Sequence, residues 1–347
     1  MEEIWKIGVR KGGSRGLHKS FTLRCRHCRR APSPQGRLGA EEVLVYRTIL
    51  VPLDGSHSAE AVVPFARAIA ERSGAGLEFV LVHHSSVPGG IPEGFTAYAE
   101  ASRKAAQAYL EQAPGRLVPG QVIKTTASLL EGPVAEAITK HVLATRPDLI
   151  VMSTHGRGAF NRFWMGSVAD RLVRSLPIPM VLIRTDPDDT SAGPAPVPAR
   201  IAVALDRSGF GETVLGPAGD LAAMFEAELV LLHVVHPPLP IAEPPLPYVV
   251  GYDEEIAKEL ESQAEAYLGA LAGVLRQKGL AVITRIAPGG DTATTILGLV
   301  EESDAGMVAI ASHGESGVRR FLLGSVADKI LRGATVPVLI CRPTTEH

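Results

Sequence analysis

The chain has 347 residues, of which 46% are hydrophobic and 21% are charged, and its formal net charge is −2. This length predicts two domains, each with enough apolar residues for a core, and the near-neutral charge argues against a protein built to bind polyanions. No stretch approaches the roughly 18 consecutive apolar residues of a membrane helix, and three cysteines are too few for a disulfide framework. We therefore expect a cytoplasmic protein with no membrane partner and no specific nucleic-acid partner.

The leader, residues 1–45, differs in composition from the rest of the chain. It holds ten Lys and Arg against four Asp and Glu, and it shows neither helical nor strand periodicity. This composition predicts disorder. Two functional alternatives are a metal site built on Cys25 and Cys28 and a basic arm that contacts nucleic acid or lipid headgroups. A further alternative is that the protein starts near Val43 or Val45.

The rest of the chain contains two copies of one pattern. The thirty residues that begin at His155 align without a gap with the thirty that begin at His313, and twelve of these positions are identical. Such self-similarity indicates a tandem duplication. The predicted parts are the leader at 1–45, a first domain at 46–185, a linker at 186–199 and a second domain at 200–343.

Short apolar runs alternate with segments of helical periodicity in the first copy, and the second copy repeats this order. The predicted strands are Ile49–Leu53, Leu77–His83, Val122–Ser128, Leu149–Ser153 and Met180–Arg184. The predicted helices are Ser58–Arg72, Ala97–Leu117, Pro133–Ala144 and Ser167–Ser175. Pro64 predicts a kink in the first helix. Alternating strands and helices predict an α/β fold in which each domain has a doubly wound parallel sheet with helices on both faces.

Polar residues follow the first and fourth predicted strands of each copy. An Asp-x-Ser segment follows the first strand, and a His-Gly pair followed nine residues later by a Gly-Ser pair follows the fourth. Ligands of doubly wound sheets bind at the carboxyl ends of the strands. The Gly-Ser pair opens a helix, whose free N–H groups suit a phosphate. The alternative is a capping box, because Ser167 is followed three residues later by Asp170 and Ser325 by Asp328.

No nucleophile, general base or metal cluster repeats at a spacing useful for catalysis. The chain lacks the phosphate loop G-x-x-x-x-G-K-[ST], a G-x-G-x-x-G after a strand, and the H-x-G-H and S-G-G-x-D signatures of adenylyl transferases and ATP pyrophosphatases. We therefore expect a protein that is not an enzyme, with slow, incidental ATP hydrolysis at most, and no metal site.

The clusters at the strand ends resemble those of the universal stress protein family, and the resemblance covers both copies. Family members that bind ATP carry the pattern G-x2-G-x9-G-[ST]. Its last three positions match in both copies, whereas the first position is Ser153 in one copy and Ala311 in the other. The resemblance implies two tandem domains of the adenine-nucleotide α-hydrolase-like fold, each with a site for ATP, ADP or AMP, with or without Mg²⁺.

The resemblance also implies which residues contact the nucleotide. In the first copy they are Pro52, Asp54, Ser56, His84, Met152, Ser153, His155, Gly156, Arg157, Gly166, Ser167 and Val168. In the second copy they are Asp206, Ser208, Val234, Ile310, Ala311, His313, Gly314, Gly324, Ser325 and Val326. Asp54 and Asp206 would recognise the adenine side of the nucleotide, and the alternative is that they cap the following turn.

The two copies differ at two of the implied positions. The residue after the second-strand His, which lines the base pocket as Val in the family, is Val234 in the second copy and His84 in the first. Arg157 adds positive charge near the phosphates in the first copy, where the second has Glu315. The first copy therefore suits phosphates better, and the second suits the base better.

The resemblance implies a stress-response protein whose nucleotide occupancy alters its association with a protein partner. The last strand of each copy is expected at a sheet edge, where unpaired backbone groups favour pairing. Since that edge mediates dimer contacts in the family, we expect the two copies to form an internal pseudo-dimer, which could dimerise again as a homodimer. The alternative function is a nucleotide-free structural or regulatory scaffold in which both glycine loops are structural.

Overall fold

The computed structural model describes residues 46–84, 96–120, 123–154, 165–185, 197–236, 254–312 and 323–342. All of them lie in one compact unit of the chain, which begins at Leu44. The predictions made for the leader and for most of the linker lie outside these residues. Among the described helices, none is both long and apolar enough to cross a membrane.

The secondary structure follows the duplication, and the described residues of each half of the unit form five strands. The strands of the first half are β1 (Thr48–Leu53), β2 (Gly76–His83), β3 (Thr125–Glu131), β4 (Leu149–Ser153) and β5 (Met180–Ile183). The strands of the second half are β6 (Arg200–Ala204), β7 (Glu228–Val235), β8 (Val282–Pro288), β9 (Met307–Ala311) and β10 (Val338–Cys341).

The helices also recur in the same order. The helices of the first half are α1 (His57–Glu60), α2 (Val63–Ser73), α3 (Thr96–Leu117), α4 (Val134–Thr145) and α5 (Ser167–Ser175). Those of the second half are α6 (Gly209–Glu212), α7 (Leu215–Phe225), α8 (Glu254–Gln277), α9 (Thr292–Glu302) and α10 (Ser325–Gly333).

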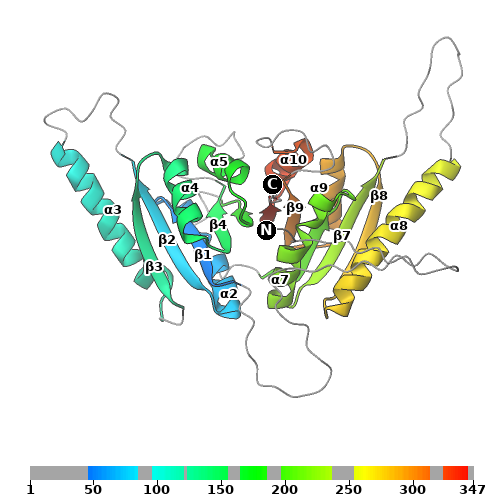
Figure 1. Cartoon of the computed structure of the whole chain (residues 1–347), viewed down its shortest axis with the longest axis horizontal. Helices are drawn as coiled ribbons and strands as arrows, with labels where there is room; N and C mark the ends of the chain where they lie inside the picture. The colour runs from blue at the N-terminus through cyan, green and yellow to red at the C-terminus, as the bar shows by residue number, and fades with distance from the viewer. Residues whose placement is uncertain are drawn as a thin grey trace, which may run out of the picture. The chain divides into compact units, whose positions relative to one another are not determined.

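One ten-stranded sheet runs through both halves in the order β3-β2-β1-β4-β5-β10-β9-β6-β7-β8. The strand pairs within each half are parallel. The two halves of the unit lie side by side in Figure 1. At the seam between them, β5 and β10 pair antiparallel, with Val181 opposite Leu339. The doubly wound parallel fold is confirmed, and the last strands of the two halves pair with each other as expected for an internal pseudo-dimer. The further homodimer stays a prediction.

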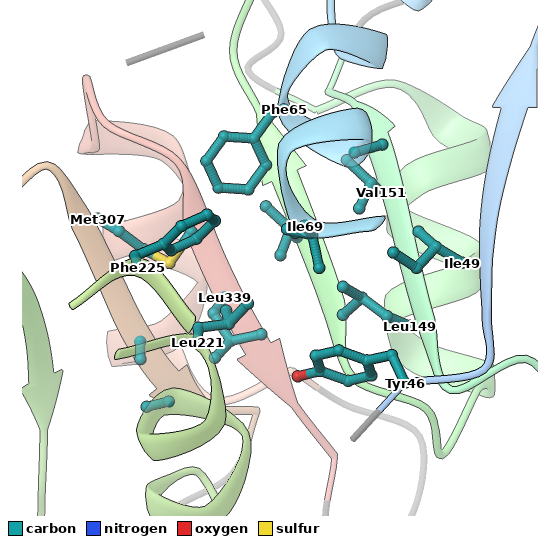
Figure 2. Packing of buried hydrophobic residues seen from close by; sticks show 14 of the residues in the cluster. Tyr46, Ile49, Phe65, Ile69, Leu149, Val151, Leu221, Phe225, Met307 and Leu339 are labelled. Atoms are coloured by element: carbon teal, nitrogen blue, oxygen red, sulfur yellow. The ribbon is translucent and has the colours of Figure 1, made fainter. Parts of the chain in front are cut away.

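Each face of the sheet carries its own apolar core, and each core crosses the seam. Helices α2, α3, α7 and α8 cover one face, and α4, α5, α9 and α10 cover the other. On the first face, Phe65 of α2 and Phe225 of α7 bring residues of the two halves together, with ring centroids 5.8 Å apart (Figure 2). The two halves therefore share their hydrophobic interior as well as their sheet.

Two predicted elements differ from the structure. The kinked helix expected over 58–72 is two helices, because the chain leaves α1 after Glu60 and Pro64 lies in the first turn of α2, where its missing N–H costs no hydrogen bond. Strand β3 begins and ends three residues after the expected strand Val122–Ser128. Its side chains are mostly exposed or half-buried, so its sequence lacks the apolar run that marks the central strands.

Candidate functional site

A cavity of about 720 Å³ lies at the carboxyl ends of the strands in the second half. Residues from the ends of β6, β7 and β9 and from the first turns of α9 and α10 line it. Strands β6 and β9 are neighbours in the sheet, and their crossover connections run in opposite directions, which is where doubly wound sheets bind ligands. The predicted site residues that line this cavity are Asp206, Val234, Ile310, Ala311, Gly324, Ser325 and Val326.

A hydrogen-bonded turn fixes Asp206 at the cavity wall. Its Oδ1 accepts hydrogen bonds from the backbone N–H of Ser208 at 3.0 Å and from the Ser208 hydroxyl at 2.6 Å. The Ser208 hydroxyl oxygen in turn accepts from the N–H of Gly211 at 2.9 Å, so that Ser208 caps α6. Ser208 is buried in this role and does not face the cavity.

The first half repeats this turn. Asp54 Oδ1 accepts from the backbone N–H and the hydroxyl of Ser56 at 2.9 and 2.5 Å, and Ser56 caps α1. The interpretation that both aspartates cap the following turn is therefore correct, and the oxygen that does so is Oδ1 in each of them. The contact of these carboxylates with adenine stays a prediction.

The helices that follow the fourth strands begin without a side-chain cap. The N-cap residues of α5 and α10 are Gly166 and Gly324, and the structure assigns neither helix a side-chain hydrogen bond at its described N-terminus. Ser167 and Ser325 are the first helical residues, and both are exposed. The capping-box interpretation of these serines is wrong, since a capping serine must precede the first helical residue.

The acidic residues of the expected capping boxes have other partners. Asp170 accepts hydrogen bonds from Arg174 Nε at 2.9 Å, and Asp328 accepts from Arg332 Nε at 2.7 Å. These pairs join residues four apart on the helix surface, and the carboxylates raise the pKa of both arginines. The first-turn amides of α5 and α10 are thus left with the partial positive charge of a helix N-terminus.

Gly166 also has a packing role. Its N–H donates to the carbonyl of Thr154 at 2.7 Å, and a Cβ at this position would lie 3.2 Å from the same oxygen. Gly324 repeats the hydrogen bond, donating to the carbonyl of Ser312 at 2.9 Å. The two glycines therefore hold the N-terminus of each helix against the end of the fourth strand of its half. A structural role of this kind is also what the nucleotide-free scaffold would require of them.

Three comparisons relate this chain to known proteins. The profile of the universal stress proteins matches residues 45–184 and again residues 199–342. The chain belongs to the universal stress protein family. A relative from Mycobacterium tuberculosis is 28% identical over 305 residues, which cover 85% of this chain and 96% of that protein. The crystal structure of a universal stress protein from Archaeoglobus fulgidus covers 87% of this chain and 100% of its own, with a TM-score of 0.64 at 19% identity, and so shares its fold.

Other relatives match over a shorter length. A second universal stress protein from Mycobacterium tuberculosis is 27% identical over 201 residues. This alignment covers 58% of the present chain and 63% of that relative, so the match spans less than two thirds of the relative's length.

The sheet register corrects one predicted equivalence in this universal stress protein. Leu77 of β2 pairs with the residue five positions before Asp54, and Leu229 of β7 pairs with the residue five positions before Asp206. Leu77 and Leu229 therefore occupy equivalent positions in the two halves. Counting along the second strand from these residues places Val82, not His84, at the position of Val234. The predicted equivalence of His84 with Val234 is wrong, because the neighbouring histidines suggested an alignment that differs from the strand register by two residues. The first half therefore has a valine at this position, and its contact with a base stays a prediction.

The counterpart of His84 is His236, which lines the cavity. His236 Nε2 lies 2.9 Å from Thr292 Oγ1, and His84 Nδ1 donates to the carbonyl of Gly132 at 3.0 Å. Both contacts tie the loop after the second strand to the end of the third strand or to the helix that follows it. His233 also lines the cavity, but it is largely buried, and its Nδ1 donates to the carbonyl of Leu205 at 2.8 Å.

The remaining predicted residues of the first half lie at the same edge of its sheet. Met152 and Ser153 are buried at the end of β4, and Pro52 is half-buried near the end of β1. Val168 is half-buried in the first turn of α5. The predicted site residues outside the described part of the chain are His155, Gly156, Arg157, His313 and Gly314, together with Glu315.

Sequence reasoning missed several residues of the cavity wall. Arg207, Leu260, Thr292 and Ile296 line it. Leu260 and the two residues of α9 come from helices far from the motifs, and only packing brings them to the site. Arg207 had a signal in the sequence, since it is the central residue of an Asp-x-Ser segment. In the described part of the chain, no group of three or more His, Cys, Asp or Glu side chains could hold a metal ion.

Proposed function

We propose that this universal stress protein binds an adenine nucleotide, ATP, ADP or AMP, and acts in the cytoplasm during stress by changing its association with a protein partner when the nucleotide is bound. The observation that carries the proposal is the cavity at the ends of β6 and β9. It joins an Asp, an apolar wall and an uncapped helix N-terminus in one space. Its volume lies within the range of about 300–1,000 Å³ typical of small-molecule sites.

The lining residues match the parts of a nucleotide. The first-turn amides of α10, beginning at Ser325, would bind the phosphates, because no side chain of the described residues caps this helix and the amides carry the positive end of the helix dipole. Val234, Ile310 and Ile296 offer an apolar surface to the base. The carboxylate of Asp206 would accept hydrogen bonds from the adenine amino group or a ribose hydroxyl. A Mg²⁺ ion carried by the phosphates would reduce their repulsion from this carboxylate.

Nucleotide carried through purification provides the first test. Protein purified under native conditions is expected to release an adenine nucleotide on denaturation, identified by mass spectrometry of the extract. Titration calorimetry of the emptied protein with ATP, ADP and AMP then measures affinity in each half. Flat titrations with all three, together with an empty extract, contradict nucleotide binding and favour the scaffold.

The substitutions Ser167→Asp and Ser325→Asp separate a phosphate site from a structural helix start. Each adds a negative charge at the first residue of an exposed helix N-terminus, which stabilises the helix by about 0.3–1 kcal/mol. The same charge repels a bound phosphate, so ATP affinity in that half is expected to fall by at least about tenfold. Calorimetric titration and a thermal melt of each variant measure both effects.

Glycine substitutions would not make this distinction, because Gly166 packs against Thr154 and its replacement also strains the fold. An unchanged ATP affinity in both serine variants would show that the nucleotide, if bound, does not use these helix termini. Partner association is tested by native mass spectrometry of lysate complexes with and without added nucleotide. Equal association under both conditions contradicts the regulatory part of the proposal.

A further inference from the structure

Arg207 occupies a backbone conformation that disfavours a long side chain. It lies in the turn between β6 and α6 with a φ of 67°, and its counterpart in the first half is Gly55, with a φ of 77°. This left-handed region is open to glycine but carries a steric cost for residues with a Cβ. Among non-glycine residues of the described chain, such a φ is otherwise found at Arg146, Glu226 and Asp304. Residues held in this conformation concentrate at functional sites.

The side chain of Arg207 has no partner among the described residues. It is exposed, lines the cavity, and makes no hydrogen bond or ion pair with any other residue in the described ranges. Among the described residues of the cavity wall, Arg207 is the Lys or Arg residue and Asp206 is the Asp or Glu residue. The charge of Arg207 also acts on Tyr267 of α8, where it opposes the effect of burial, which raises the pKa of the Tyr267 hydroxyl. An arginine without an ion-pair partner at a cavity wall provides a charged donor for an anionic ligand.

We propose that Arg207 determines ligand specificity in the second half by binding the phosphate chain of the nucleotide. The inference rests on the proposed function and deepens it. Arg207 and the N-terminal amides of α10 line the same cavity, so one anionic chain can contact both. The second half then selects nucleoside diphosphates and triphosphates over adenosine, whereas Gly55 gives the first half no charge at this position. This assignment reverses the expectation that the second half suits phosphates less well.

The substitution Arg207→Gly installs the residue that the first half already carries. Because glycine adopts a positive φ freely, the variant is expected to keep its melting temperature. Titration is done on the full chain in a Ser167→Asp background, which reduces binding in the first half. Loss of the charged hydrogen bond is expected to weaken ATP binding at least about tenfold while adenosine binding changes by less than about twofold. Arg207→Lys is expected to recover part of the ATP affinity, and that recovery falls as salt concentration rises.

The reciprocal substitution Gly55→Arg, in a Ser325→Asp background, is the matched experiment in the first half. It is expected to raise the ratio of ATP affinity to adenosine affinity there. An unchanged ratio in Arg207→Gly, in protein that binds ATP, overturns the role of Arg207 and leaves the proposed function intact. Failure of the unaltered protein to bind ATP, AMP or adenosine up to millimolar concentration overturns the proposed function, and this inference with it.

Discussion

Gly211 shows how closely the second half is fitted around its Asp. A Cβ built on Gly211 would lie 2.3 Å from Asp206 Oδ1, so any side chain at this position forces the carboxylate or α6 to move. The first half has Ala59 at the equivalent position, and this residue is buried. Its N–H donates to Ser56 Oγ at 3.2 Å, which is longer than the corresponding hydrogen bond of Gly211. The two halves therefore form the same turn, but the capping hydrogen bond is shorter in the second half.

Gly211→Ala is expected to displace the Asp206 carboxylate from the cavity wall. Strain of this kind costs about 1–3 kcal/mol of stability, and nucleotide affinity in the second half should fall by about tenfold, since a displacement near 1 Å is costly at a preorganised site. Calorimetric titration and denaturant unfolding measure the two effects. The matched variant Ala59→Gly removes a methyl group from the first half and should leave affinity unchanged. Wild-type affinity in Gly211→Ala would show that Asp206 does not contact the ligand.

At the scale of single residues, the sequence predicted local turns and burial better than it predicted which residues of the two halves are equivalent. The Asp-x-Ser turn and the burial of Cys341, whose thiol pKa is raised by that burial, were predictable from local pattern. The equivalence of Val82 and Val234 was not, because adjacent histidines and valines permit two alignments that only the strand register separates. The sequence left two roles open for Ser167, because a serine at the start of a helical pattern looks the same whether it caps the helix or is its first residue.

The short helix α1 is anchored by a cluster that its counterpart α6 lacks. Glu60 of α1 accepts hydrogen bonds from both terminal nitrogens of Arg116 at 2.7 and 2.6 Å and from the Tyr109 hydroxyl at 2.6 Å, all from α3. The Arg116 hydrogen bonds lower the pKa of Glu60. In the second half, Glu212 accepts from Tyr267 at 3.0 Å and has no arginine partner in the described part of the chain.

Glu60→Gln is expected to reduce stability in a pH-dependent way. Because the folded-state pKa of Glu60 is lowered, its stabilisation is complete above the unfolded pKa of about 4.3 and is lost as pH falls through the lowered value. The difference from the unaltered protein should be up to about 1 kcal/mol at pH 7, since Arg116 is partly exposed, and should vanish in strong acid. Urea unfolding at pH 7 and near pH 3 measures it. Glu212→Gln is the control, and an equal pH dependence in both variants contradicts the role of Arg116.

At the scale of elements, predictability followed burial. Strand β4 and helix α5 have the bounds expected from sequence, because β4 is buried along its whole length and α5 has a strongly one-sided apolar face. Strand β3 was misplaced by three residues because a half-exposed strand carries little apolar pattern. The division of the first predicted helix into α1 and α2 depends on the cap at Ser56 and on Pro64. The sequence indicated that Pro64 disturbs the helix, but not that a new helix begins next to it.

At the scale of the molecule, the seam joins two domains into one folding unit. Val181 of β5 and Leu339 of β10 are fully buried, and each would lie on an exposed edge strand if its half folded alone. Phe225 of α7 contacts Phe65 across the seam, and the guanidinium of Arg72 in α2 lies 5.4 Å from the centre of the Phe225 ring. The family resemblance predicted that the last strands of the two halves would meet. The core that the halves share also depends on side chains of α2 and α7, which no repeat analysis singles out.

Because both cores cross the seam, the described unit is expected to unfold in one cooperative transition, with equal calorimetric and van't Hoff enthalpies. Phe225→Ala removes a buried ring and should cost about 3 kcal/mol, and differential scanning calorimetry should show the entire transition moving to lower temperature. Leu275→Ala, a truncation in α8 away from the ring pair, should move the same single transition. Two separate transitions in the unaltered protein, or a first-half transition that Phe225→Ala leaves in place, would show that the halves fold independently despite their shared sheet.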